Sequence, residues 1–397
     1  MDALTTPLNW QRVRLGDICE IIGGGTPSTQ ITSFWNGSIN WFTPTEIGIT
    51  KYVYKSQRTI TPLGLKKSSA KLLPIGTILL TSRASIGDCA IIKEIATTNQ
   101  GFQSLIPLEK VNNEFLYYLI LTLKNKLLKL ASGSTFLEVS PNKIKNLLIP
   151  LPPLNEQNAI ANILSALDRY LCALRALILK KEGVKKALSF ELLSQRKRLK
   201  DFNQAWQRVR LGDICEFGNG EAYETLIVEN GDFKLISLNS IDIDGNLKNT
   251  MKRVNFYDNS LKQDDIVMVL SDVAHGDFLG LCAVIPSNDY VLNQRMGRLR
   301  IRNDCINILF LRLYINANQK YFKMQGQGSS QLNLSKKAIE DFEILLPPLN
   351  EQNAIANILS ALDNEIASLK NKKRQFENIK KALNHDLMSA KIRVLEK

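Results

Sequence analysis

The sequence predicts two mixed α/β domains in tandem, each followed by a long helix, because the chain repeats itself and each repeat ends in a heptad pattern. The eleven residues WQRVRLGDICE occupy positions 10–20 and again positions 206–216. A further eighteen residues, LPPLNEQNAIANILSALD, recur at 151–168 and 346–363. A period of about 195 residues matches the size of a domain and far exceeds that of a solenoid repeat. Each copy is therefore expected to fold as a unit.

The segments between the identical blocks differ in sequence but keep sparse landmarks. Asn99-Gln100 corresponds to Asn293-Gln294, and Ser140 corresponds to Ser335. One fold that carries two different surfaces is typical of a frame that presents two recognition domains to two targets. We expect four segments in chain order: a first domain at 1–150, a central long helix at 151–200, a second domain at 201–345 and a C-terminal long helix at 346–397.

Local patterns predict the elements of each domain. Apolar runs bounded by turn residues indicate strands at 75–81, 86–92, 266–270 and 281–285. Apolar residues at helical spacing indicate one helix at 114–130 in the first copy and one at 306–323 in the second.

The two predicted long helices carry apolar residues at alternating steps of four and three, which is a heptad seam. Asn155 and Asn350 are candidate N-caps. Neither helix can bury its apolar stripe alone, so the two are expected to pack on each other as a coiled coil within one chain, or else on partner subunits. In the first helix the seam comprises Ile160, Leu164, Leu167, Leu171, Leu174 and Ile178, and in the second it begins with Ile355, Leu359, Leu362, Ile366 and Leu369.

Positive charge is concentrated in the distal parts of these helices. The chain carries a formal net charge of +13. Residues 169–200 contain ten Lys or Arg against two Glu, and residues 370–397 contain nine against three acidic residues. These segments are candidates for contacts with acidic protein surfaces or DNA phosphates. With no signal peptide and no apolar run of about 18 residues, a cytoplasmic protein without a membrane segment is expected.

The residue inventory argues against catalysis. His275 and His385 are the only histidines, which leaves little material for a histidine-based nucleophile or metal site. The glycines at 23–25 lack the G-K-[ST] of a P-loop, and methyltransferase motifs are absent. The acidic pair Asp264-Asp265 is interpreted as a solvated face or a cap, and the six cysteines as buried reduced thiols. The chain is expected to have no catalytic residues, no bound metal and no cofactor.

Polar and basic side chains on predicted loops are the candidates for reading nucleic acid. Arg and Lys can bond to guanine edges, Gln can pair with adenine, and Asp can accept from cytosine. Each is a weak signal by itself, because a charged or polar side chain on a loop is usually just solvated. In the first copy the candidates are Lys66, Lys67, Ser82, Arg83, Gln100, Ser134 and Thr135, and in the second they are Lys252, Arg253, Asp272, His275, Arg295, Arg298, Gln325 and Gln327.

These motifs together resemble the specificity subunit of type I restriction-modification enzymes along the whole chain. The resemblance is carried by WQRVRLGDICEIIGGGTPS, WNGSINWFTP, LTSRASIGDCAI, TNQGFQSL and IPLPPLNEQNAIANIL, and the second copy keeps RLGDICE, LNQ, GSSQLNLS and LPPLNEQNAIANIL. It implies two α/β target recognition domains joined by two antiparallel helices, which would relate the halves by a pseudo-twofold axis. It also implies double-stranded DNA, two adenine methyltransferase subunits and, through them, ATP-dependent restriction subunits as partners.

The function expected from this resemblance is recognition of an asymmetric, bipartite DNA site by a subunit that has no catalytic activity of its own. The alternative is a coiled-coil scaffold whose globular domains bind proteins. Sequence-selective, salt-dependent binding to duplex DNA would separate the two hypotheses.

Overall fold

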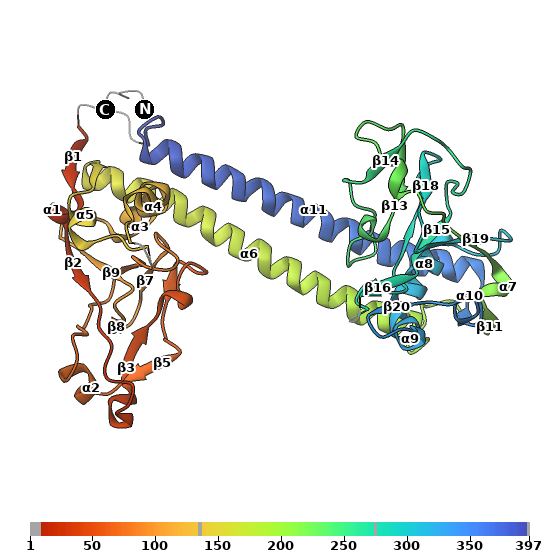
Figure 1. Cartoon of the computed structure of the whole chain (residues 1–397), viewed down its shortest axis with the longest axis horizontal. Helices are drawn as coiled ribbons and strands as arrows, with labels where there is room; N and C mark the ends of the chain where they lie inside the picture. Colours follow the sequence, from red (N-terminus) through yellow and green to blue (C-terminus); the bar gives the residue numbers. More distant parts are fainter. Residues whose placement is uncertain (1–8, 134–136, 274–275, 395–397) are drawn as a thin grey trace. The chain divides into compact units, whose positions relative to one another are not determined.

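The computed structural model describes residues 9–133, 137–273 and 276–394, and these residues form two units. Unit 1 comprises Met1–Ala176 and Asn371–Lys397, and unit 2 comprises Leu177–Lys370. Each unit therefore contains one α/β domain, the first half of the long helix that follows it, and the last part of the other long helix (Figure 1). Within the described ranges, every helix is too short or too polar to span a lipid bilayer.

Unit 1 contains three sheets, with strand orders β2–β9–β6–β7–β4, β5–β3–β8 and β1–β10. Its strands are β1 Gln11–Arg14, β2 Cys19–Gly23, β3 Trp35–Phe42, β4 Tyr52–Val53, β5 Arg58–Ile60, β6 Ile78–Leu80, β7 Cys89–Ile92, β8 Ala96–Thr98, β9 Gln103–Pro107 and β10 Leu148–Leu151. Its helices are α1 Leu15–Ile18, α2 Pro62–Lys66, α3 Asn113–Thr122, α4 Lys124–Leu130, α5 Pro141–Lys145 and the start of α6 Leu154–Leu193. The sheet β5–β3–β8 and α2 lie away from α6, whereas α3, α4 and α5 lie beside it (Figure 1).

Unit 2 contains sheets of order β12–β19–β15–β17 and β14–β13–β18, and the pairs β16–β20 and β11–β21. Its strands are β11 Gln207–Arg210, β12 Cys215–Asn219, β13 Phe233–Ile236, β14 Lys252–Val254, β15 Ile266–Val269, β16 Ser271–Val273, β17 Cys282–Val284, β18 Tyr290–Leu292, β19 Met296–Ile301, β20 Gln331–Asn333 and β21 Glu343–Leu346. Its helices are α7 Leu211–Ile214, α8 Ile308–Ala317, α9 Gln319–Gln325, α10 Lys336–Glu340 and the start of α11 Leu349–Met388.

The two units share one topology although their sequences diverge. The strands β2–β9–β6–β7 of unit 1 correspond to β12–β19–β15–β17 of unit 2. In both three-stranded sheets the central strand, β3 or β13, pairs antiparallel with one neighbour and parallel with the other. The four strands predicted from sequence are confirmed as β6, β7, β15 and β17, and β6, β7 and β15 are buried along their whole length. The shared fold follows from equivalent buried positions.

Two predictions about helices were wrong in detail. The single helix expected in each domain is two helices, α3 with α4 and α8 with α9, because a polar side chain bonds to a carbonyl at the end of the first. Thr122 Oγ1 donates to the carbonyl of Leu119 at 2.7 Å, and Asn318 Nδ2 donates to that of Tyr314 at 2.8 Å. The expected caps Asn155 and Asn350 lie one residue inside helices that begin at Leu154 and Leu349.

In unit 1 the beginning of α6 packs against the end of α11. Asp168 on α6 pairs with Lys380, and Arg175 pairs with Glu377 at 2.9 Å. Residue numbers rise along α6 while those of the partners fall along α11, so the two helices are antiparallel in this unit. The seam residues Ile160, Leu164, Leu171 and Leu174 of α6 are buried.

In unit 2 the beginning of α11 packs against the end of α6 in the same way. Asp363 on α11 pairs with Lys185, and Lys370 pairs with Glu182 at 2.8 Å. These four residues occupy the repeat positions equivalent to the four in unit 1. The prediction that the two long helices pack on each other within one chain is confirmed, and Ile355, Leu359 and Ile366 of the seam are buried.

A buried glutamate at the start of each long helix joins three distant segments. In unit 1, Glu156 is only 2% exposed. It accepts hydrogen bonds from the indole of Trp10 at 3.0 Å and from Arg393, beyond the end of α11, at 2.7 and 3.0 Å. Leu387 and Met388, in the last turn of α11, enter the same hydrophobic core. The domain of unit 1 is thus completed by the C-terminal part of the chain.

Unit 2 repeats this arrangement. Glu351, which is 0% exposed, accepts from Trp206 at 3.0 Å and from Arg198 at 3.1 and 2.6 Å. Arg198 follows the end of α6, just as Arg393 follows the end of α11. Burial of a carboxylate is favourable only when its charge and lone pairs are satisfied, so each glutamate requires the arginine of the other repeat.

In unit 1 a polar network also connects the α/β domain to α6. Lys51 Nζ lies 2.8 Å from Glu114 Oε2 on α3, 3.0 Å from the Tyr118 hydroxyl and 2.8 Å from Ser165 Oγ on α6. Burial alone would raise the pKa of Glu114, but hydrogen bonds from Lys51, Ser165 and Tyr52 outweigh it and lower the pKa to about 2. The charged form of Glu114 therefore stabilises the folded unit.

We expect Arg393→Ala to destabilise unit 1 by roughly 3 kcal/mol, because Glu156 would remain buried without its cation; this is the lower end for a buried ion pair, since the Arg393 side chain is 32% exposed. Calorimetric unfolding should show the loss. Arg198→Ala should affect unit 2 instead, and Lys381→Ala, which removes an exposed lysine of α11, is the matched control. Equal stability of Arg393→Ala and Lys381→Ala would contradict the assigned role of Arg393.

Acid should weaken unit 1 through Glu114. Since its folded pKa of about 2 lies below the ordinary value of 4.5, its contribution is present above pH 4.5 and is lost as the pH falls toward 2. Glu114→Gln should flatten this part of the stability profile, measured by circular dichroism during acid titration. Glu109→Gln, at an exposed site, should keep the wild-type profile; an identical profile for the two variants would refute the role of Glu114.

Candidate nucleic-acid interface

The glycine-rich loop at residues 23–28 is held by two buried tryptophans. Trp41 Nε1 donates to the carbonyl of Gly25 at 2.9 Å, and Trp35 Nε1 donates to that of Ser28 at 3.0 Å. The two rings pack edge to face with centroids 5.0 Å apart, and the guanidinium of Arg58 lies 3.7 Å from the centre of the Trp35 ring. Both tryptophans therefore position the loop.

Glycines at equivalent positions, Gly24 in unit 1 and Gly220 in unit 2, allow the first loop of each domain to lie directly against another backbone segment. A Cβ at Gly24 would lie 1.9 Å from the carbonyl oxygen of Asn99, and a Cβ at Gly220 would lie 2.1 Å from that of Asn293. Asn99 and Asn293 are the equivalent residues of the recurring Asn-Gln pair. In both units, the first loop of the domain therefore packs against the backbone of this Asn-Gln pair.

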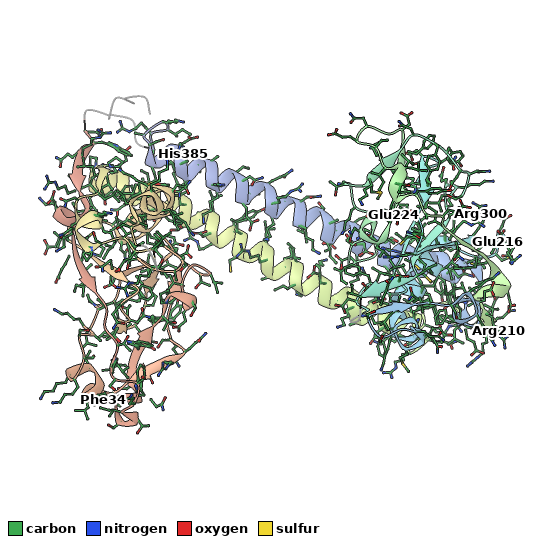
Figure 2. The ribbon with its side chains drawn as sticks, in the orientation of Figure 1. Phe34, Arg210, Glu216, Glu224, Arg300 and His385 are labelled. Carbon is green, nitrogen blue, oxygen red and sulfur yellow. The ribbon has the colours of Figure 1, made fainter. Side chains whose placement is uncertain are left out.

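The side chains at this contact differ between the units. In unit 1, Thr26 Oγ1 donates to Gln100 Oε1 at 2.5 Å. In unit 2, Asn293 Nδ2 donates to Glu224 Oε1 at 3.0 Å, and a hydrogen bond from Gln294 is the main cause that lowers the pKa of Glu224. Figure 2 labels Glu224, and also Glu216 and Arg300 of the same unit.

Two further segments complete the same region in each unit. In unit 1, Ser132 and Glu138 exchange backbone hydrogen bonds of 3.0 and 3.1 Å, and Ser82 N–H donates to the carbonyl of Gly101 at 2.8 Å. In unit 2 the equivalent bonds join Gln327 with Asn333 at 3.0 and 2.9 Å, and Leu270 N–H with the carbonyl of Arg295 at 2.9 Å. We call these segments the loop rim: residues 23–28, 81–83, 99–101, 132–133 and 137–138 in unit 1, and residues 219–224, 270–273, 293–295 and 327–333 in unit 2.

The rim of unit 1 contains some of the residues predicted to contact nucleic acid. Gln100 is exposed, and Arg83 is about half exposed and pairs with Glu138 at 2.9 Å. Ser82 is fully buried, which leaves it no surface for a base contact in this conformation. Lys66 and Lys67 are exposed at the end of α2, shortly before the Ser69 and Ala70 atoms that touch Gly25. Ser134 and Thr135 lie outside the described residues.

In unit 2 the predicted residues divide into two groups. Arg295 is exposed on the rim at a φ of 67°, and Gln327 and Gln325 are exposed within it or next to it. Asp272 belongs to the rim, but its carboxylate accepts from the backbone N–H groups of Val273 and Phe278 at 2.8 and 2.7 Å, which is a loop-stabilising role.

The remaining predicted residues of unit 2 lie elsewhere. Lys252 and Arg253 are on β14, where Arg253 donates to the carbonyl of Gly231 at 2.8 Å. Arg298 on β19 pairs with Glu216 at 2.6 Å. His275 lies outside the described residues. Thr26, Glu138, Glu224 and Asn333 were not predicted, because only the folded structure brings them to the rim. The sequence signals nearby were the recurring Asn-Gln pair, the glycines at 23–25 and the GSSQLNLS segment.

The acidic and thiol groups have structural roles. The interpretation of Asp264-Asp265 as a solvated face was wrong for Asp265, which is 2% exposed and accepts two hydrogen bonds from Arg300, at 2.8 and 2.6 Å. Burial raises the pKa of Cys19 and Cys215 to about 12, and Cys89 and Cys282 are buried as predicted. The same prediction was wrong for Cys172 and Cys305, which are exposed.

Among the described residues, no group of three or more His, Cys, Asp or Glu could hold a metal ion.

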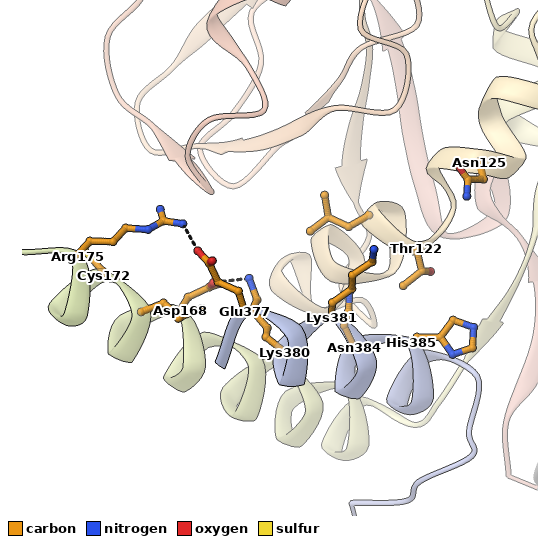
Figure 3. A pocket seen from close by; sticks show the side chains of 12 residues that line it. Thr122, Asn125, Asp168, Cys172, Arg175, Glu377, Lys380, Lys381, Asn384 and His385 are labelled. Atoms are coloured by element: carbon orange, nitrogen blue, oxygen red, sulfur yellow. Dashed lines mark hydrogen bonds and ion pairs between the residues drawn. The ribbon is translucent and has the colours of Figure 1, made fainter. Parts of the chain in front are cut away.

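A cleft of about 510 Å³ lies in unit 1 between the helix pair and the junction of α3 with α4 (Figure 3). Charged residues of α6 and of the end of α11 line this cleft. Lys380 of α11 donates a hydrogen bond to Asp168 of α6, and Arg175 of α6 donates one to Glu377 of α11. Lys380 therefore forms an ion pair within the chain, and so does Lys185 at the equivalent position of α6. Lys381 and Lys186 are exposed.

The family model for the type I restriction modification DNA specificity domain matches residues 7–182 and again residues 203–378. The chain belongs to this family. The resemblance seen in the motifs is thereby confirmed, and the two matches coincide with the two repeats of this type I specificity protein.

Several relatives are named as specificity subunits. The MjaIX specificity subunit of Methanocaldococcus jannaschii is 43% identical over 166 residues, which are 41% of this chain and 38% of that protein. The MjaVIII specificity subunit of the same organism is 27% identical over 428 residues, covering 99% of this chain and 95% of the relative. The crystal structure of the S subunit from M. genitalium superimposes with a TM-score of 0.63 at 19% identity and covers 98% of both chains, which shows the same fold.

Proposed function

We propose that this chain is a DNA-specificity subunit without catalytic activity of its own, which recognises an asymmetric, bipartite site through one loop rim per half-site. It would hold two adenine methyltransferase subunits, and restriction subunits through them, on double-stranded DNA in the cytoplasm. The observation that carries the proposal is the rim itself. Its backbone contacts are equivalent in the two units, while the side chains it presents are different.

The rim chemistry suits base recognition. In unit 1 it offers the amide of Gln100 and the guanidinium of Arg83, and in unit 2 it offers Arg295 and Gln327. An amide can pair with adenine and a guanidinium with guanine in the major groove. Because each rim lies on a separate domain with its own core, each can change its base preference without unfolding the other.

The basic ends of the long helices would contact the partners or the DNA backbone. Since Lys185 and Lys380 are paired with Asp363 and Asp168, the exposed Lys186 and Lys381 are the better candidates. The competing function is a scaffold that binds proteins through the same domains. Sequence-selective binding to duplex DNA that weakens steeply with salt would favour the specificity subunit, and its absence would favour the scaffold.

Single substitutions in the rims should change one half-site at a time. Gln100→Ala should relax the first half-site and Arg295→Ala the second, each with a roughly 10- to 100-fold loss of discrimination at one position, as expected for the loss of one good base contact. Sequencing of methylated adenines in cells that carry the variant with its methyltransferase gives the readout. Lys252→Ala, on β14 outside the rim, is the control, and a change in both half-sites from one substitution would contradict the assignment.

If the helix pair sets the distance between the two half-sites, longer helices should lengthen the spacer. Four residues inserted after Arg175 in α6 and after Lys370 in α11 add about one helical turn, or 6 Å, an insertion that heptad helices tolerate. The spacer should grow by about two base pairs at 3.4 Å each, with unchanged half-sites. The control places four residues in the exposed loop at 303–305. An active variant with an unchanged spacer would show that the helices do not set the spacing.

A further inference from the structure

The ion pairs between α6 and α11 are the same kind of pair in both units. Asp168–Lys380 in unit 1 matches Asp363–Lys185 in unit 2, and both α6 and α11 therefore carry Asp near the start and Lys near the end. In the pairs Arg175–Glu377 and Lys370–Glu182, and in Glu156–Arg393 and Glu351–Arg198, equivalent positions of the two repeats likewise carry the same charge. Either helix could form these pairs equally well with an antiparallel second copy of itself. These ion pairs therefore give neither helix a preference for the other helix of its chain over a second copy of itself.

One pair differs between the units. In unit 1, Tyr170 of α6 packs on Phe376 of α11, with ring centroids 4.7 Å apart. The equivalent positions in unit 2 hold an ion pair, in which Lys181 of α6 lies 2.8 Å from Glu365 of α11. One contact is therefore aromatic and the other is charged, at the same place in the helix pair.

This difference penalises pairing of a helix with its own copy. Two α6 helices from different copies of the chain would place Tyr170 against Lys181 at both sites, and two α11 helices would place Glu365 against Phe376. A lysine beside tyrosine keeps a cation–π attraction. Lys181 is 30% exposed and Glu365 is 45% exposed, so each keeps part of its hydration and the penalty is that of a partly exposed ion pair. A glutamate beside phenylalanine loses its cation, so the α11 pair is the more unfavourable.

We propose that these four positions are a pairing code, by which α6 and α11 of one chain select each other over the same helix in a second copy of the chain. The code goes beyond DNA recognition, because it determines which surfaces of two copies are compatible. The partner that it rejects is a second copy of this chain, paired α6 to α6 and α11 to α11.

Exchanges that preserve composition test the code in the full chain. Lys181→Phe with Phe376→Lys leaves Glu365 facing an aromatic ring in place of its lysine within the chain, while pairing between two copies becomes matched at these four positions. We expect the midpoint of thermal unfolding to fall by roughly 2–4 °C, with the loss in unit 2. Sedimentation at tens of micromolar should show more dimer than in the wild type. Tyr170→Glu with Glu365→Tyr should act in the same way, with the loss in unit 1.

The fourfold exchange, which combines both pairs of substitutions, restores matched contacts within the chain. It should return the unfolding midpoint and the monomer fraction to wild-type values. If the four residues acted only through their own burial, the fourfold variant would be at least as unstable as either double variant, and that result would overturn the proposal. Wild-type stability and mass in both double variants would overturn it as well. Rescue by the fourfold variant remains measurable even if a double variant fails to fold.

Discussion

The fold depends on a carboxylate that is buried at the start of each long helix. Glu156 and Glu351 are removed from water, and each is neutralised by an arginine that belongs to the other repeat. The tryptophan at the beginning of the same repeat completes the set of hydrogen bonds. Because a buried, unpaired charge is strongly unfavourable, this arrangement links the beginning of a repeat, the start of its long helix and the end of the other long helix. The most distant parts of the chain are thereby joined in unit 1.

The same constraint explains the distribution of charge. The net charge of +13 comes from the distal parts of the two helices, where a sequence-based view expects surfaces that are free for partners. Part of this charge, on Lys181, Lys185, Lys370 and Lys380, is instead paired with acidic residues of the opposite helix. The lysines that remain exposed, such as Lys186 and Lys381, form a smaller set available to a partner or to DNA phosphates.

The loop rim combines a constant backbone with variable side chains. The approach of Gly24 to Asn99, and of Gly220 to Asn293, leaves no room for a side chain, so the backbone of the rim is constrained in both units. Its side chains are less constrained, because Gln100, Arg295 and Gln327 are exposed. A surface of this kind can change its chemistry without a change of fold, which is the property required of two different DNA readers on one frame.

The repeat, the mixed α/β domains and the two long helices could be predicted from the sequence alone, because identical blocks and a heptad period are local, one-dimensional signals. The Asn-Gln landmark also marked part of the rim. Three features could not be predicted, since they depend on contacts between residues far apart in the chain. Ser82 is buried, Arg298 is paired with Glu216, and Arg393 completes the first domain from the far end of the chain. Residue type and spacing show which side chains can carry charge or hydrogen bonds, but burial and partner geometry decide which remain available, and only the tertiary structure determines those.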